Sequence, residues 1–151
     1  MITPFTENLY LGDMRDVLAV ERDQSFEVLI FVARPIATIY WSNYGKRQFH
    51  IVPLKVGEEN ISKNELDFII SLIDPNKKTL LACNQGIERS PLVMAYYFHK
   101  LSGVPFDVAY SKVCELRPET QRREVWLEEG VIENVSPSNL FAIFHQGVGF
   151  G

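Results

Sequence analysis

The chain has 151 residues, of which 46% are hydrophobic, 12% aromatic and 23% charged. This length suits one domain with a substantial core, and the balanced composition excludes a disordered, collagen-like or coiled-coil protein. Fifteen Lys and Arg against 19 Asp and Glu give a net charge of -4, so no general positive field attracts nucleic acid or anionic lipid. We therefore expect a single domain over residues 1–151, without a nucleic-acid or membrane partner but with room for a local anion site.

The cysteines and the start of the chain indicate a compartment. Cys83 and Cys114 are too few for a disulfide-stapled secreted scaffold, which favours the reducing cytoplasm. The first ten residues resemble no secretion signal, and no stretch reaches the roughly 18 apolar residues of a membrane span. The three histidines lie far from one another and from any zinc-ligand spacing with cysteine, so we expect no metal and no cofactor.

The first half of the chain predicts a short helix and two strands. The helix covers about residues 13–22. Residues 27–33 form an apolar run rich in β-branched and aromatic side chains, which is typical of a strand buried on both faces. Residues 48–54 predict a second strand, with Pro53 near its end, where a missing backbone donor does least harm.

A helix and a third strand follow in the middle of the chain. Ser62 and Glu65 have the spacing of a capping box, and the apolar residues after them recur with helical spacing. This pattern predicts a helix over residues 62–73, which Pro75 terminates. The apolar run over residues 78–83 predicts another buried strand.

The second half of the chain is predominantly helical. Ser90 and Pro91 place a capping residue and a first-turn proline at the start of a helix over residues 90–102. Residues 105–116 predict an amphipathic helix, and residues 123–134 a shorter one.

Strands that alternate with helices pair in parallel through crossover connections. The pattern therefore predicts an α/β fold, a three-layer sandwich whose mainly parallel central sheet is flanked by helices. Residues 136–151 form a C-terminal tail that either packs against the domain or binds a partner.

The residues with the clearest chemistry lie between the third strand and the helix after it. Cys83 ends the strand, a five-residue loop separates it from Arg89, and the helix begins at Ser90. Ligands of α/β proteins bind beyond the carboxyl ends of strands, where a helix N-terminus offers free N–H groups and a positive dipole end. These groups and Arg89 favour a nucleophilic thiolate at Cys83, and the planar guanidinium fits two oxygens of a phosphate.

The loop itself predicts a cradle for phosphate oxygens. Gly86 tolerates a positive φ, which lets successive backbone N–H groups converge on one point. Ser90 is placed to assist departure of the Cys83 thiolate when a thiophosphate is hydrolysed. The predicted phosphate-binding residues are Asn84, Gln85, Gly86, Ile87, Glu88 and Arg89.

This C-x5-R-S segment resembles the cysteine-dependent protein tyrosine phosphatases, specifically the dual-specificity group. Residues 2–12, which end in Leu-Tyr-Leu-Gly, look like the opening strand of that group, and residues 52–54 look like its strand before the acid loop. Residues 111–118 look like its helix that ends in Arg-Pro. The resemblance covers residues 2 to about 130. It implies a phosphotyrosine-phosphatase-like fold. It also implies hydrolysis of phosphotyrosine, and of phosphoserine or phosphothreonine as well, in phosphorylated proteins through a cysteinyl-phosphate intermediate.

Three positions depart from the family pattern. Ala82 replaces the histidine that normally precedes the cysteine, and Glu88 brings a negative charge into the loop, which weakens anion binding unless it turns toward solvent or an arginine. Val56 stands where the family has its general acid, an aspartate. We favour Glu58 or Glu59 as the acid, with Glu88 as a third candidate because one related phosphatase class carries Glu before the arginine.

Two alternatives to a protein phosphatase stay open. The first, which the three departures motivate, is a catalytically impaired pseudophosphatase that binds phosphorylated partners without turning them over. The second is an enzyme acting on lipid, nucleotide or RNA phosphates. The loop carries no lysine for such highly charged substrates, so we favour a phosphoprotein monoester.

Overall fold

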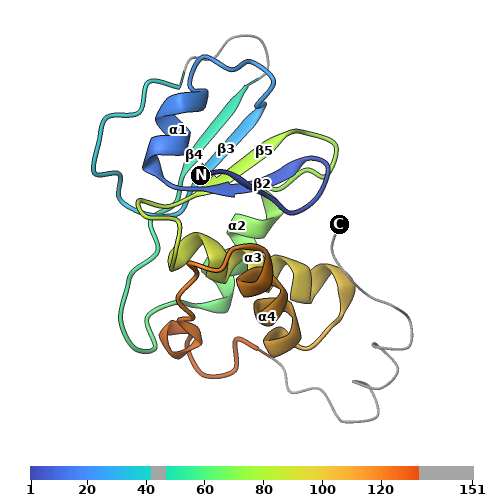
Figure 1. Ribbon diagram of the computed structural model, residues 1–151. Helices are drawn as coiled ribbons and strands as arrows, with labels where there is room; N and C mark the ends of the chain where they lie inside the picture. The colour runs from blue at the N-terminus through green and yellow to red at the C-terminus, as the bar shows by residue number, and fades with distance from the viewer. Residues whose placement is uncertain (42–46, 133–151) are drawn as a thin grey trace.

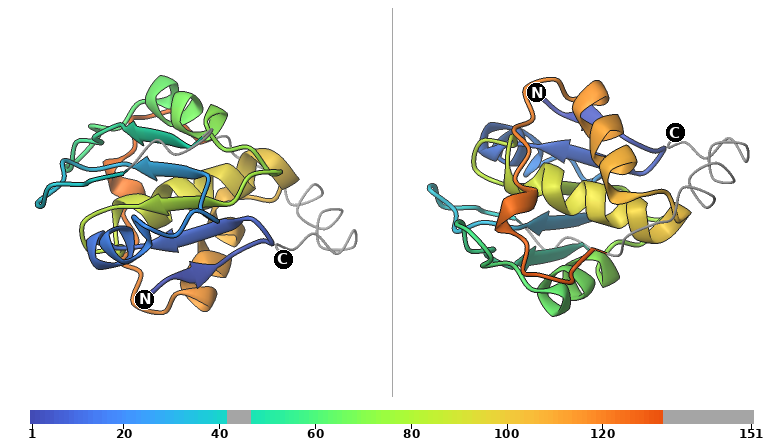
Figure 2. Two further views of the ribbon diagram at one scale, coloured as in Figure 1. Left: turned by 90° about the horizontal axis from the view of Figure 1, so that it is seen from above. Right: turned by 90° about the horizontal axis from the view of Figure 1, so that it is seen from below.

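The computed structural model describes residues 1–41 and 47–132, so the predicted tail over residues 136–151 lies outside the described residues. Figure 1 shows a central sheet with helix α1 on one face and helices α2, α3 and α4 on the other. The two views of Figure 2, from above and from below, separate these layers. The predicted α/β architecture is confirmed.

The sheet has five strands in the order β1-β2-β5-β3-β4. Strands β2, β5, β3 and β4 are parallel neighbours, whereas β1 pairs with β2 in the antiparallel direction. The three strands predicted from apolar runs are present and shorter than predicted, and β2 is the strand implied by the family resemblance. The strands are β1 (Thr3–Pro4), β2 (Leu9–Gly12), β3 (Val28–Phe31), β4 (Gln48–Ile51) and β5 (Thr79–Ala82).

Side-chain caps begin two of the helices, α1 and α2. The Ser62 hydroxyl accepts the Glu65 N–H, which completes the predicted capping box, and Asp13 and Asp16 form a second box at the start of α1. The helices are α1 (Met14–Val20), α2 (Lys63–Ser71), α3 (Arg89–Ser102) and α4 (Phe106–Leu116). None of them is long and apolar enough to cross a bilayer, a statement that covers the described residues alone.

The helix cap predicted at Ser90 is wrong. Helix α3 begins one residue earlier, at Arg89, and its N-cap residue, Glu88, makes no side-chain capping hydrogen bond. The Ser90 hydroxyl contacts Sγ of Cys83 at 3.1 Å instead of capping the helix.

The helix predicted over residues 123–134 is wrong for its described part. Residues Glu124–Trp126 form only one turn of 3-10 helix, η1. The backbone N–H of Glu59 binds the carbonyl of Val125, and the next two N–H groups bind that of Trp126. An α-helix would need these carbonyls for its own hydrogen bonds, so the contact with residues 59–61 ends helical structure here.

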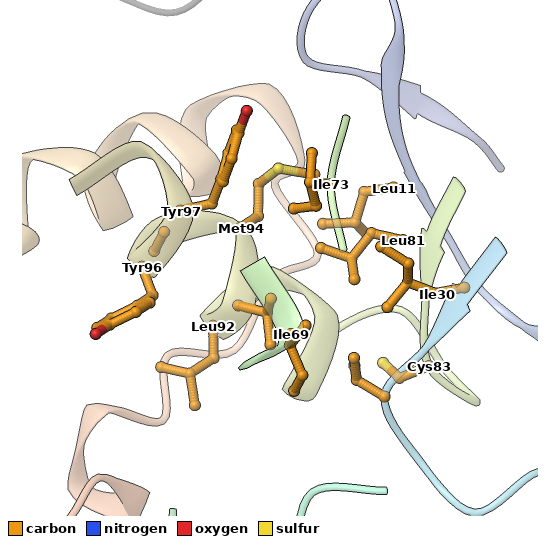
Figure 3. Packing of buried hydrophobic residues seen from close by; sticks show 14 of the residues in the cluster. Leu11, Ile30, Ile69, Ile73, Leu81, Cys83, Leu92, Met94, Tyr96 and Tyr97 are labelled. Carbon is orange, nitrogen blue, oxygen red and sulfur yellow. The ribbon is translucent and has the colours of Figure 1, made fainter. Parts of the chain in front are cut away.

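Helix α3 is central to the core and directly supports the loop before it. Its residues 90–99 are all buried, and it packs against the sheet and α4. Figure 3 shows α3 side chains such as Leu92 and Met94 in the same buried cluster as Leu81 from β5, and Cys83 belongs to this cluster as well. The start of α3 is therefore held rigidly by a well-packed core.

Candidate active site

The candidate site lies at the carboxyl end of β5, in the interior of the sheet between β2 and β3. Cys83 follows β5 directly, and Arg89 is the first residue of α3. The loop between them crosses the edge where parallel strands end and where α3 presents its free N–H groups. This is the placement predicted from the spacing of Cys83 and Arg89.

A pocket of about 290 Å³ opens at this loop. It is lined by Ile36, Cys83, Asn84, Gln85, Glu88 and Arg89. Cys83 is only 2% exposed, so its side chain is largely enclosed by protein. In the part of the chain that the structure describes, the Arg89 side chain has no hydrogen-bond or ion-pair partner, which leaves its guanidinium free to bind an anion.

Ser90 contacts the sulfur of Cys83 twice. Its Oγ lies 3.1 Å from Sγ, and its backbone N–H donates to Sγ over 3.4 Å. Ser90 is completely buried in the first turn of α3, so this arrangement is fixed by the core. A hydroxyl and an amide at one sulfur can stabilise the negative charge that develops on a leaving thiolate.

Gly86 adopts the backbone conformation that a tight loop requires, with φ of 67°. A Cβ at this position would lie 2.6 Å from Nη2 of Arg117 and 2.9 Å from the carbonyl oxygen of Gly12. The Nε of Arg117 donates to the Gly86 carbonyl over 2.8 Å, and its Nη1 donates to Met1 O and to Thr3 Oγ1. The buried Arg117 thus ties the loop to the first strand, a role that the sequence analysis missed.

Asn84 connects the loop to the segment after β3. Its Nδ2 donates to the carbonyl of Arg34 over 2.7 Å, and its Oδ1 accepts the N–H of Ile36 at 3.0 Å. The side chain of Asn84 is therefore engaged in positioning this segment. As a result Ile36, which the sequence analysis did not identify, becomes an apolar wall of the pocket.

Glu88 lines the pocket, and its carboxylate is paired. Its Oε2 accepts a hydrogen bond from Nε of Arg123 over 2.9 Å. The loop is also joined to this part of the chain at Ile87, whose carbonyl accepts the N–H of Gln121 at 2.7 Å. Glu88 thus turns toward an arginine, which is the arrangement in which its charge least harms anion binding.

The two carboxylates favoured as general acid lie on an exposed turn. Glu58 and Glu59 follow Gly57, and Glu59 itself has a positive φ of 55°. The N–H of Glu59 donates to the carbonyl of Val125, which anchors the turn to η1. Neither carboxylate is among the residues that line the pocket, and Val56 is exposed.

Metal ligands do not gather near this pocket or elsewhere in residues 1–41 and 47–132. No three His, Cys, Asp or Glu side chains in those ranges come together as a metal site would require.

Comparisons with known proteins identify the fold. No family model matches the chain, and no curated protein matches its sequence. Several solved structures do match. The human tyrosine phosphatase-like serine/threonine/tyrosine-interacting protein has a TM-score of 0.70 at 15% identity, covering 97% of this chain and 95% of that one. Human DUSP28 has a TM-score of 0.67 at 17% identity, covering 83% of this chain and 86% of that one.

The OH1 protein of the Orf virus, a tyrosine phosphatase, matches with a TM-score of 0.61 at 18% identity over 86% of this chain and 80% of that one. The chain has the fold of the dual-specificity and tyrosine phosphatases. The phosphatase-like fold implied by the C-x5-R-S segment is therefore confirmed. Within this fold, the segment that carries the resemblance supplies Cys83, Asn84, Gln85, Glu88 and Arg89 to the lining of the pocket.

Proposed function

We propose that this protein is a cysteine-dependent phosphatase that hydrolyses phosphotyrosine in proteins, with phosphoserine and phosphothreonine as further substrates. The observation that carries the proposal is the pocket that combines Cys83 with the guanidinium of Arg89, which has no ion-pair partner within residues 1–41 and 47–132. It unites a nucleophile, a fixed cation and a helix N-terminus, which are the groups that phosphoryl transfer to sulfur requires. The phosphatase fold supports the same reading.

The reaction proceeds in two displacements. Sγ of Cys83 attacks phosphorus and the bond to the ester oxygen breaks, so the phosphoryl group passes to sulfur and the leaving oxygen takes up a proton. The N–H groups of residues 84–89 and the guanidinium of Arg89 hold the three equatorial oxygens. Water then attacks phosphorus and gives its proton to the carboxylate that protonated the leaving oxygen. The bond to Sγ breaks, inorganic phosphate leaves, and Ser90 stabilises the thiolate that is released.

The proton for the leaving oxygen comes from Glu58 or Glu59 in this proposal. The turn of residues 57–60 must then approach the pocket, because neither carboxylate lines it. Glu88 is a weaker candidate, since its carboxylate is held as an acceptor by Arg123. An aryl phosphate with an activated leaving group needs no such proton, so its hydrolysis should depend little on the acid.

The test compares phosphate release from para-nitrophenyl phosphate and from a phosphoserine peptide, between about pH 5 and about pH 8. We expect Cys83→Ser to abolish both reactions. Glu58→Gln or Glu59→Gln should slow the peptide reaction about a hundredfold and the aryl reaction much less. Equal rates for the wild type and Cys83→Ser would refute cysteine-based catalysis.

The second candidate function is a phosphate-dependent binding module. Val56 stands at the acid position, and the pocket wall lacks Glu58 and Glu59. One structural neighbour is itself called a phosphatase-like interacting protein. A binding module should bind a phosphotyrosine peptide with measurable affinity and release no phosphate from either substrate, which separates it from the enzyme.

A further inference from the structure

Glu88 poses an electrostatic problem for a pocket that takes a phosphoryl group. Its carboxylate lines the pocket, and its side chain is 29% exposed, so the negative charge lies at the pocket surface. A phosphate monoester brings further negative charge into the same space. Unit charges a few ångströms apart in a protein repel each other by several times the thermal energy.

Glu88 could also bind the neighbouring cation, Arg89, in place of the substrate. Arg89 follows it directly, and both side chains line the pocket. A carboxylate without another partner would offer the Arg89 guanidinium a bidentate acceptor in competition with the substrate. The structure instead leaves Arg89 without an ion-pair partner among the described residues, because Glu88 is engaged elsewhere.

Arg123 is the residue that engages Glu88, and it is held in place from several sides. Its Nη2 donates to Oε1 of Gln121 over 2.8 Å, and its Cζ lies 5.4 Å from the centre of the Trp126 ring. Its backbone N–H donates to the hydroxyl of the buried Tyr110 over 3.0 Å. A guanidinium fixed in this way presents its Nε to Glu88 at little cost in side-chain entropy.

The chain segment that carries Arg123 is also fastened to the loop through the backbone. The N–H of Gln121 donates to the carbonyl of Ile87 over 2.7 Å. Two consecutive loop residues are therefore bound by one short segment: Ile87 by Gln121, and Glu88 by Arg123. The ion pair is part of a built interface and not a chance contact of two long side chains.

We propose that Arg123 is a positioning residue of the phosphate pocket. It neutralises Glu88 and holds the carboxylate against the pocket wall, so that Arg89 and the loop N–H groups face the oxygens of the substrate. The inference rests on the proposed function, because it assumes that the pocket binds a phosphoryl group. Arg123 itself does not contact the reacting atoms in this assignment.

Binding of tungstate, a tetrahedral oxyanion, measured by titration calorimetry tests the proposal alongside kinetics with para-nitrophenyl phosphate. We expect Arg123→Gln to weaken tungstate binding and to raise KM, each about tenfold, with a smaller change in kcat. Adding Glu88→Gln should restore both values, because the charge that Arg123 neutralises is then gone. Arg123→Lys should keep most of the affinity.

Lys112→Gln is the matched control. Lys112 lies on α4 and pairs with Glu115 at 3.7 Å, so its replacement removes the same charge from the protein without freeing Glu88. We expect its tungstate affinity to equal that of the wild type. Thermal unfolding of each variant separates loss of binding from loss of folding. If Arg123→Gln does not fold, Arg123→Met, which keeps an apolar stem beside Trp126, should show the same tenfold loss of affinity, and adding Glu88→Gln to it should restore the affinity.

The outcomes separate this inference from the proposed function. Unchanged tungstate affinity in Arg123→Gln, or a loss that Glu88→Gln does not restore, would overturn the role of Arg123 and leave the phosphatase proposal standing. A wild type that binds no tungstate would overturn both. A wild type that binds tungstate and shows the expected pattern without turnover would support the role of Arg123 in a binding module.

Discussion

Replacing Gly86 by alanine tests how tightly the loop is built against its supports. Alanine in the left-handed region costs about 1–2 kcal/mol. The added Cβ would also meet Arg117 Nη2 at 2.6 Å and the Gly12 carbonyl at 2.9 Å, and backbone cannot move aside as a flexible side chain does. Overpacking of this kind costs about 1–3 kcal/mol, and weakening the buried bond from Arg117 adds about 1 kcal/mol or more.

We therefore expect Gly86→Ala to lower the free energy of unfolding by about 4 kcal/mol, measured by urea denaturation. Gly103→Ala is the matched control, because Gly103 has nearly the same backbone angle, 72°, and nothing within 4 Å of its added Cβ. It should lose only the backbone contribution of about 1–2 kcal/mol. Equal losses in the two variants would refute the argument that the contacts with Arg117 and Gly12 constrain the loop.

Three further predictions concern the pocket and its surroundings. Ser90→Ala removes the hydroxyl at 3.1 Å from Cys83 Sγ, so a rapid-mixing assay should show a burst of nitrophenol followed by turnover about tenfold slower; an unchanged steady-state rate would contradict this. Ile36→Ser should lower kcat/KM for a phosphotyrosine peptide about tenfold, through lost apolar contact with the ring, and for a phosphoserine peptide much less; equal losses would contradict it. Burial raises the pKa of Tyr110, so the unfolded chain loses this proton first and the free energy of unfolding should fall as the pH rises above about 10. Tyr110→Phe should lessen that fall, and an identical pH dependence in the variant would contradict the assignment.

The parts of the fold that were predicted correctly depend on local signals. Apolar runs identify β3 and β5 because both are buried in full, and the capping box at Ser62 identifies the start of α2. The helix predicted after residue 123 fails for a non-local reason. The carbonyls of Val125 and Trp126 accept the N–H groups of residues 59–61, which lie more than sixty positions earlier. No local sequence pattern predicts a contact at that separation.

In the candidate site too, the contacts between residues close in sequence were predicted, and those between distant residues were not. Cys83 and Ser90 lie seven residues apart, so a strand, a loop and a helix suffice to bring them together as the spacing predicted. Ile36 lines the pocket beside Asn84, a residue predicted to bind phosphate, whose side chain accepts the Ile36 N–H across 48 positions of sequence. A polar side chain at a loop position has the same appearance in the sequence whether it faces a ligand or a neighbouring segment.

The supports of the loop explain why it tolerates an acidic residue. Three consecutive loop residues are each bound by one segment after α4: Gly86 by Arg117, Ile87 by Gln121, and Glu88 by Arg123. Two of these bonds are made to backbone carbonyls, so the carbonyls of Gly86 and Ile87 point toward donors of that segment. The third bond binds the one carboxylate of the loop. The segment of residues 117–123 thus sets both the direction of these carbonyls and the net charge of the pocket. A substitution in this segment should therefore change oxyanion affinity more than it changes the reactivity of the Cys83 sulfur.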